Sequence, residues 1–251
     1  MPPVSKPDPW LPYRKPRPGA KVRLFCFPYA GGGASLFRGW QEELPPTVDV
    51  CAVQLPGREG RLRDAPIADI TKLVPMIADG LAAHLAPPFA FFGHSMGSIL
   101  AFELARELRR RNHAEPAHLF ASACPAPHIP DDDATHDLPE DALIGRLRDL
   151  GGMSEEVLAH RELMEMILPV FRADAAITET YAHTEEPPLD VPITAFGGLS
   201  DEKATRADMD AWRQHTRGAF ALAMVPGGHF YIQGDGRAPV IAAIARTLAV
   251  L

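Results

Sequence analysis

The chain reads Phe89-Ala90-Phe91-Phe92-Gly93-His94-Ser95-Met96-Gly97 at the stretch that decides its fold, and the helical pattern 99–105 follows directly. An apolar strand that turns sharply into a helix through Gly-x-Ser-x-Gly is typical of a nucleophile elbow. The two glycines keep neighbouring side chains from clashing in the tight turn, and the start of the helix supplies backbone N–H groups beside the serine. The sequence therefore predicts Ser95 as a catalytic nucleophile, with a purely structural serine turn as the alternative.

On both sides of this elbow, apolar strand-like runs alternate with helical patterns. This alternation is typical of a parallel sheet that is covered by helices on both faces. The predicted strands are 22–27, 48–54, 89–92, 118–123, 193–196 and 219–225. The predicted helices are 36–44, 69–85, 95–111, 207–216 and 239–250, and Pro75 should kink the second of them or mark its restart.

Residues 125–188 interrupt the alternation, because they contain two helical stretches, 139–150 and 154–181, and no convincing strand. A connection this long between two sheet strands is expected to be functional. Several apolar residues follow helical spacing in the second stretch: Val157, Leu158, Leu163, Met166, Ile167, Val170 and Phe171. Two interpretations stay open, since this stripe could only pack the insertion onto the sheet or could also line a substrate channel.

A histidine and an acid that could complete a triad follow the elbow in the chain order of this fold. His229 lies in the glycine-rich loop Gly227-Gly228-His229 after a predicted strand, whereas His94 should point away from the Ser95 hydroxyl. Asp201 directly follows another strand, where its carboxylate can accept the imidazole N–H of His229. The adjacent Glu202 is an alternative acid; Asp174, inside the insertion, and Asp235, close in sequence to the histidine, are poorer candidates.

Hydrolysis at an acyl carbon also needs donors for the developing oxyanion. One predicted donor is the backbone N–H of Met96, next to the nucleophile, and the other is the N–H of Ala30 in the glycine-rich loop after the first strand. A shift of one residue in that loop would select Tyr29 or Gly31 instead. The loop lacks the glycine spacing of phosphate-binding motifs, so we do not expect a nucleotide there.

Composition fits one globular α/β enzyme domain over residues 1–251. The net charge of −7 argues against nucleic acid or an anionic membrane as a partner, and no apolar stretch has the length of a signal-peptide core or a membrane span. The chain is therefore expected in the cytoplasm. Its cysteines, Cys26, Cys51 and Cys124, are odd in number and lack metal-ligand spacing, which indicates free thiols and no metal site.

These motifs together resemble the type II thioesterases, which are stand-alone α/β-hydrolases associated with polyketide and nonribosomal peptide synthases. Most of the chain resembles that family, and the most specific stretch is Gln54-Leu55-Pro56-Gly57-Arg58-Glu59, because general esterases share the elbow but lack this loop. The resemblance implies an α/β-hydrolase fold, a triad of Ser95, Asp201 and His229, oxyanion donors at Met96 and Ala30, and a helical lid over 125–188. Tyr29 departs from the family, which often has histidine there.

The resemblance also implies the substrate, an acyl thioester on the phosphopantetheine arm of an acyl or peptidyl carrier protein. The enzyme would need no cofactor of its own, since the pantetheine arrives with the partner. A fatty-acyl chain-terminating thioesterase, a carboxylesterase and a catalytically idle binding protein are the alternatives. An acidic carrier would have to dock through local features, and Arg58, Arg61 and Arg63 are candidates, unless they form only a solvated loop.

Overall fold

Six parallel strands form one sheet at the centre of the molecule. The computed structural model describes residues 8–86, 88–131, 133–150 and 155–251. The strands are β1 Val22–Phe27, β2 Val48–Ala52, β3 Phe89–His94, β4 Leu119–Ser122, β5 Ile193–Gly198 and β6 Phe220–Val225, in the order β2-β1-β3-β4-β5-β6. Each lies where the sequence predicts a strand, and the α/β-hydrolase fold class is thereby confirmed.

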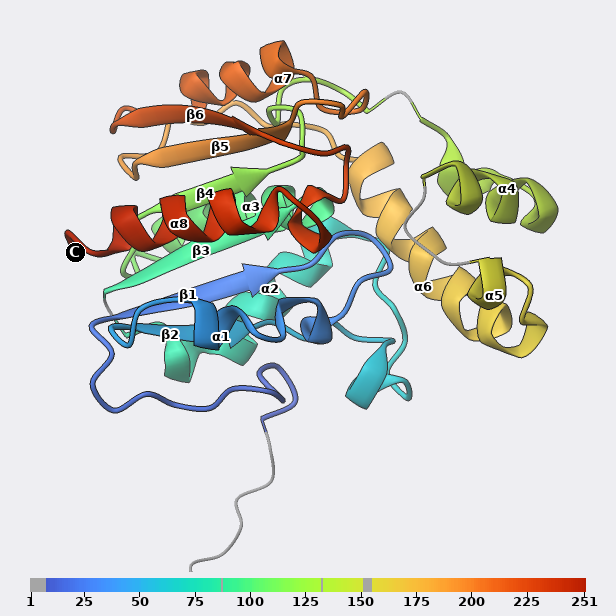
Figure 1. The fold of residues 1–251 in the computed structure, drawn as a ribbon, viewed down its shortest axis with the longest axis horizontal. Helices are drawn as coiled ribbons and strands as arrows, with labels where there is room; N and C mark the ends of the chain where they lie inside the picture. Colours follow the sequence, from blue (N-terminus) through green and yellow to red (C-terminus); the bar gives the residue numbers. More distant parts are fainter. Residues whose placement is uncertain (1–7, 87, 132, 151–154) are drawn as a thin grey trace, which may run out of the picture.

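Helices cover both faces of this sheet, as Figure 1 shows. One face packs against α1 Trp40–Glu43 and α8 Arg237–Leu248, and the other against α2 Ile70–Leu81, α3 Met96–Arg110 and α7 Arg206–Asp210. Every residue of β3 is buried, which explains why this strand is a continuous apolar run without alternation. In a parallel sheet all carboxyl ends meet at one edge, so the loops after β1, β3, β5 and β6 converge there.

Three predicted helices are shorter or divided in the structure. The predicted helix 36–44 is split into a 3-10 turn, Ala34–Phe37, and α1, because Gly39 between them adopts a left-handed φ of 83°. The predicted helix 69–85 continues through Pro75, so no restart occurs there, and ends as α2 and a short 3-10 turn. The predicted helix 207–216 is α7 followed by a 3-10 turn, Ala211–His215.

Between β4 and β5 the described residues form three α-helices, α4 Glu140–Leu150, α5 Glu155–Leu158 and α6 Arg161–Glu179, which lie together beyond the carboxyl ends of the strands (Figure 1). The prediction of one helix over 154–181 is wrong, because His160 takes an extended conformation as the N-cap of α6. The first residue of that predicted helix, Ser154, lies outside the described residues. One apolar cluster packs these helices on one another: Leu143, Leu147, Leu158, Met164, Leu168, Phe171 and Ala175. Of the predicted stripe, Leu158 and Phe171 belong to this cluster and Ile167 packs against it, whereas Met166 is exposed.

No helix in the described part of the chain has the length and apolar character needed to cross a membrane. The cysteines are buried free thiols, as predicted. Burial raises the pKa of Cys51 to about 12 and raises the pKa of Cys124 further, and the charges of Asp131 and Asp201 add to the effect at Cys124. Burial also raises the pKa of Cys26, so all three side chains are protonated at neutral pH.

Candidate active site

Ser95 stands at the turn from β3 into α3 with a φ of 53° and a ψ of −123°. A non-glycine residue in this region of φ and ψ is strained, and the strained conformation is kept because the close packing of the surrounding backbone fixes the turn. A Cβ added to Gly93 would lie 2.1 Å from the carbonyl oxygen of Gly97, and one added to Gly97 would lie 2.2 Å from that of Phe27. Only glycine fits at either position, and the turn presents the serine hydroxyl above the sheet edge.

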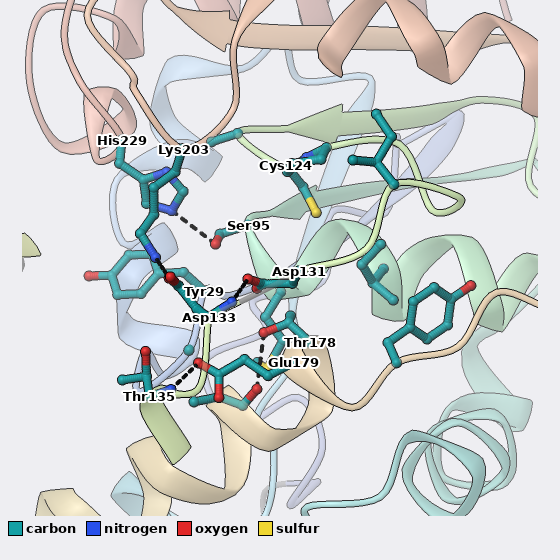
Figure 2. Close-up of a pocket in the computed structure, with 18 of the residues that line it drawn as sticks. Tyr29, Ser95, Cys124, Asp131, Asp133, Thr135, Thr178, Glu179, Lys203 and His229 are labelled. Carbon is teal, nitrogen blue, oxygen red and sulfur yellow. Dashed lines mark hydrogen bonds and ion pairs between the residues drawn. The ribbon is translucent and has the colours of Figure 1, made fainter. Parts of the chain in front are cut away.

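His229 reaches this hydroxyl from the loop after β6. Its Nε2 lies 2.9 Å from Ser95 Oγ, and Figure 2 shows the ring directed at the serine. Gly227 turns the loop with a φ of 108°, a conformation that favours glycine. The structure thus brings together two residues that are 134 positions apart in the chain.

Asp201 lies on the other side of the imidazole, with its Oδ2 3.0 Å from His229 Nδ1. The carboxylate is buried, and its Oδ1 accepts the backbone N–H groups of Lys203 and Ala204 at 3.0 and 3.3 Å. Burial raises the pKa of Asp201, but the hydrogen bond from His229 and these backbone donors outweigh it, so the pKa is lowered overall. An ionised carboxylate only accepts, which places the proton on Nδ1 and leaves Nε2 to accept from Ser95. Glu202 is exposed, and in the described part of the chain no hydrogen bond or ion pair joins it to His229.

His94, the histidine within the elbow, points away from Ser95. Its Nε2 lies 2.8 Å from the carbonyl oxygen of His229 and its Nδ1 lies 2.8 Å from Ser122 Oγ. Burial, followed by the charge of the His229 ring, lowers the pKa of His94 to about 3, so the ring is neutral. A neutral ring has one N–H, which must be on Nε2 because the carbonyl can only accept. His94 therefore holds the loop that carries His229.

Both predicted oxyanion donors lie beside Ser95 in the cavity lining. Met96 is the first residue of α3, so its N–H has no acceptor in a preceding helical turn. The N–H of Gly31 is already engaged, because it donates to Asp174 Oδ2 at 2.7 Å. That bond argues against Gly31 as the second donor, while Ala30 donates to no other atom of the described residues.

Ser95 and His229 open into a cavity of about 480 Å³ between the sheet edge and α6. Its apolar wall includes Ile99, Cys124, Pro125, Ile129, Phe171 and Tyr181. An ion pair between Lys203 and Asp133 joins the loop after β5 to the segment before α4 at the cavity (Figure 2). The space is large enough for an organic ligand with an apolar part, and the serine lies in its lining.

Comparison with known proteins identifies the family. A family model described as the thioesterase domain matches residues 22–248. The chain belongs to the thioesterase family. The gramicidin S biosynthesis protein GrsT of Aneurinibacillus migulanus is 41% identical over 230 residues, which cover 91% of this chain and 90% of that protein.

Solved structures of similar chains agree with this family. The RedJ thioesterase from the prodiginine pathway of Streptomyces coelicolor has a TM-score of 0.86 at 45% identity, covering 90% of this chain and 86% of that one. The type II thioesterase BorB from the borrelidin biosynthetic cluster has a TM-score of 0.84 at 38% identity, covering 93% of this chain and 95% of that one. The predicted resemblance to type II thioesterases is confirmed.

The loop that carries Arg58, Arg61 and Arg63, here called the arginine loop, differs from the predicted docking surface. Arg58 is buried and paired with Asp174, so its assignment to a partner surface is wrong. Arg61 is largely covered, because its guanidinium stacks over Trp10 and pairs with Asp64. Arg63 alone of the three is exposed.

Sequence reasoning missed two residues that line the cavity, Cys124 and Lys203, and the ion pair between Arg58 and Asp174. Cys124 follows β4 at the same sheet edge as the triad, and its position after a strand was a signal that it would line the cavity. Lys203, close after Asp201, offered a similar signal, but its partner Asp133 is 70 residues away. The pairing of Arg58 with Asp174 gave no local signal, since the two are 116 residues apart.

Proposed function

We propose that this thioesterase hydrolyses acyl groups from the phosphopantetheine arm of carrier proteins that serve polyketide or nonribosomal peptide synthases, with Ser95, His229 and Asp201 as its catalytic triad. The observation that carries the proposal is the continuous hydrogen-bond chain from Ser95 Oγ through His229 to Asp201, at 2.9 and 3.0 Å, of which Ser95 and His229 line the cavity. The biosynthetic contexts in which GrsT, RedJ and BorB are named support this class of substrate.

The reaction follows from the geometry in two halves. His229 Nε2 takes the proton of Ser95 as its Oγ attacks the thioester carbonyl, and Asp201 stabilises the imidazolium that forms. The N–H groups of Met96 and Ala30 donate to the tetrahedral oxyanion, and the imidazolium returns the proton to the departing thiol. Water then attacks the acyl-enzyme, with His229 again as the base, and releases the carboxylic acid.

Within this proposal, residues 125–188 act as a lid over the acyl chain. Their helices lie beyond the strand ends, and α6 contributes Phe171, Ala175, Thr178 and Glu179 to the cavity lining. The acyl group would enter between this helix and the sheet edge, which keeps water away from all but the reacting carbonyl.

Substitution of the nucleophile tests the triad. Ser95→Ala should remain folded and lose on the order of 10⁶ of kcat, as loss of a triad serine does in a serine protease. Cys124→Ala is the matched control, because it removes a thiol that lines the same cavity and that burial keeps protonated. Substantial hydrolysis by pure Ser95→Ala protein would refute the assignment.

Substrate choice separates the proposal from its alternatives. Acyl release should be compared for acylated carrier proteins, small acyl-pantetheine thioesters and simple oxygen esters. Preferred turnover of carrier-bound groups supports the proposal. Turnover restricted to medium-chain fatty acyl groups would instead favour a chain-terminating thioesterase, and faster turnover of oxygen esters would favour a carboxylesterase.

A further inference from the structure

A buried ion pair joins the helix α6 to the loop after β2. Arg58 contacts Asp174 with both guanidinium ends, Nη1 to Oδ2 at 2.5 Å and Nη2 to Oδ1 at 2.8 Å. The side chains are 7% and 1% exposed. A two-point contact of this kind fixes orientation as well as distance.

Both partners also bind the glycine-rich loop after β1. Asp174 Oδ2 accepts the N–H of Gly31 at 2.7 Å, and Arg58 Nη1 donates to the carbonyl oxygen of Gly32 at 3.1 Å. Gly31 has a φ of 77°, and a Cβ placed there would lie 3.2 Å from the Phe171 ring of α6. The loop after β1 therefore lies between the ion pair and α6, and its conformation depends on contacts with both.

We infer that Arg58 and Asp174 are positioning residues for the oxyanion site: they fix the peptide between Ala30 and Gly31 and so hold the Ala30 N–H toward the carbonyl that Ser95 attacks. The inference rests on the proposed function. An oxyanion donor contributes most when it is already aligned before charge develops. The carboxylate accepts the Gly31 N–H and thereby fixes the plane of the Ala30–Gly31 peptide. The Ala30 N–H belongs to the adjoining Tyr29–Ala30 peptide, whose carbonyl accepts the Gly32 N–H at 2.9 Å, so the turn carries the constraint from one peptide to the next.

Met96 needs no such support, because it begins a helix that is buried in the core. The two proposed donors thus depend on different parts of the molecule, one on α3 and the other on a side-chain pair that reaches from α6. A second contact steadies the far end of the same loop, where Glu59 accepts the Ser35 hydroxyl. The Leu-Pro-Gly-Arg-Glu segment accordingly supports the oxyanion loop from within the protein.

The test compares variants of this pair with a matched pair elsewhere. Asp174→Ala removes the acceptor of the Gly31 N–H, Asp174→Asn keeps an oxygen that can accept it, and Arg58→Lys keeps the charge without the two-point contact. Asp49→Ala is the control, because it breaks another buried ion pair, between Asp49 and Arg14, near the amino end of β2 and away from the catalytic site. For each variant, kcat, KM, the melting temperature and the affinity for an acyl trifluoromethyl ketone are measured, since that ketone forms a tetrahedral oxyanion with the serine.

Removal of one oxyanion donor lowers kcat by roughly 10²–10³, so we expect Asp174→Ala to approach a loss of ~10² while KM changes little. Affinity for the ketone should fall by the same factor as kcat/KM, because both report on the oxyanion. Asp174→Asn should recover part of the loss. Asp49→Ala should lower the melting temperature and leave both kcat and ketone affinity near the wild-type values.

Unchanged ketone affinity in Asp174→Asn and Arg58→Lys, or an equal loss in Asp49→Ala, would show that the pair only stabilises the fold and would overturn the inference. These two milder variants decide the matter if Asp174→Ala does not fold. A wild-type protein that hydrolyses no acyl thioester would instead overturn the proposed function and the inference with it. Wild-type activity together with full activity in the variants would overturn the inference alone.

Discussion

The substitution Asp201→Asn tests the proposed mechanism most sharply, because the structure dictates how the new amide must lie. Oδ1 of Asp201 accepts two backbone N–H groups, from Lys203 and Ala204, and Oδ2 faces His229 Nδ1. The amide oxygen of asparagine must therefore keep the backbone donors, since an NH₂ group there would meet two other donors. The NH₂ group is left facing His229 and donates to Nδ1.

A donor at Nδ1 moves the imidazole proton to Nε2, where it faces the Ser95 hydroxyl at 2.9 Å. The ring can then no longer accept the serine proton. The same change in a serine protease triad lowers kcat by ~10⁴, which corresponds to about 5.4 kcal/mol of transition-state stabilisation at about 1.36 kcal/mol for each factor of ten. KM should change little, because Asp201 does not line the cavity.

The assay is thiol release from a short acyl-pantetheine thioester, with the melting temperature measured on the same preparations. Glu202→Gln is the matched control, since it neutralises the exposed neighbouring carboxylate and should alter kcat by no more than about threefold. If Asp201→Asn keeps more than about a tenth of wild-type kcat, or if Glu202→Gln does the greater damage, the acid of the triad has been misassigned.

Three further changes probe other parts of the molecule. Thr178 lines the cavity, so Thr178→Phe should shift activity toward shorter acyl chains. Leu163 is outside the described lining, so Leu163→Trp should leave the chain-length profile unchanged. Equal shifts in the two variants would show that this cavity does not determine chain-length selectivity. Arg63→Glu should raise KM for an acylated carrier protein but not for a small thioester, and equal effects on both would exclude docking there. Burial raises the pKa of Glu186, but hydrogen bonds from three arginines outweigh it and lower the pKa from 4.5 to about 2, so its stabilising contribution is complete above pH 4.5 and is lost as the pH falls toward 2. The difference in melting temperature between wild type and Glu186→Gln should therefore shrink across that range, and a constant difference would contradict the ion-pair account.

Apolar runs that alternate with helical patterns predicted the strands well, for a physical reason. A strand buried on both faces, such as β3, must be a continuous apolar run, and that signal is local. Helix ends were predicted less well because they depend on single backbone conformations. Gly39 divides one predicted helix by adopting a left-handed φ, and His160 divides another by becoming extended, although neither residue breaks the apolar pattern around it.

The arginine loop shows why a side chain's role can be invisible in the sequence. Arg58 and Arg63 are five positions apart in one loop and chemically identical, yet one is buried and the other exposed. The difference comes from Asp174, 116 residues from Arg58, because a guanidinium is buried only where a carboxylate and backbone carbonyls can satisfy it. The fold brings that carboxylate to the loop after β2, so no reading of the loop alone could separate the two arginines. The same reasoning makes Asp174 a poor candidate for the triad: its oxygens are already occupied by Arg58 and Gly31, whereas Asp201 keeps one oxygen for His229.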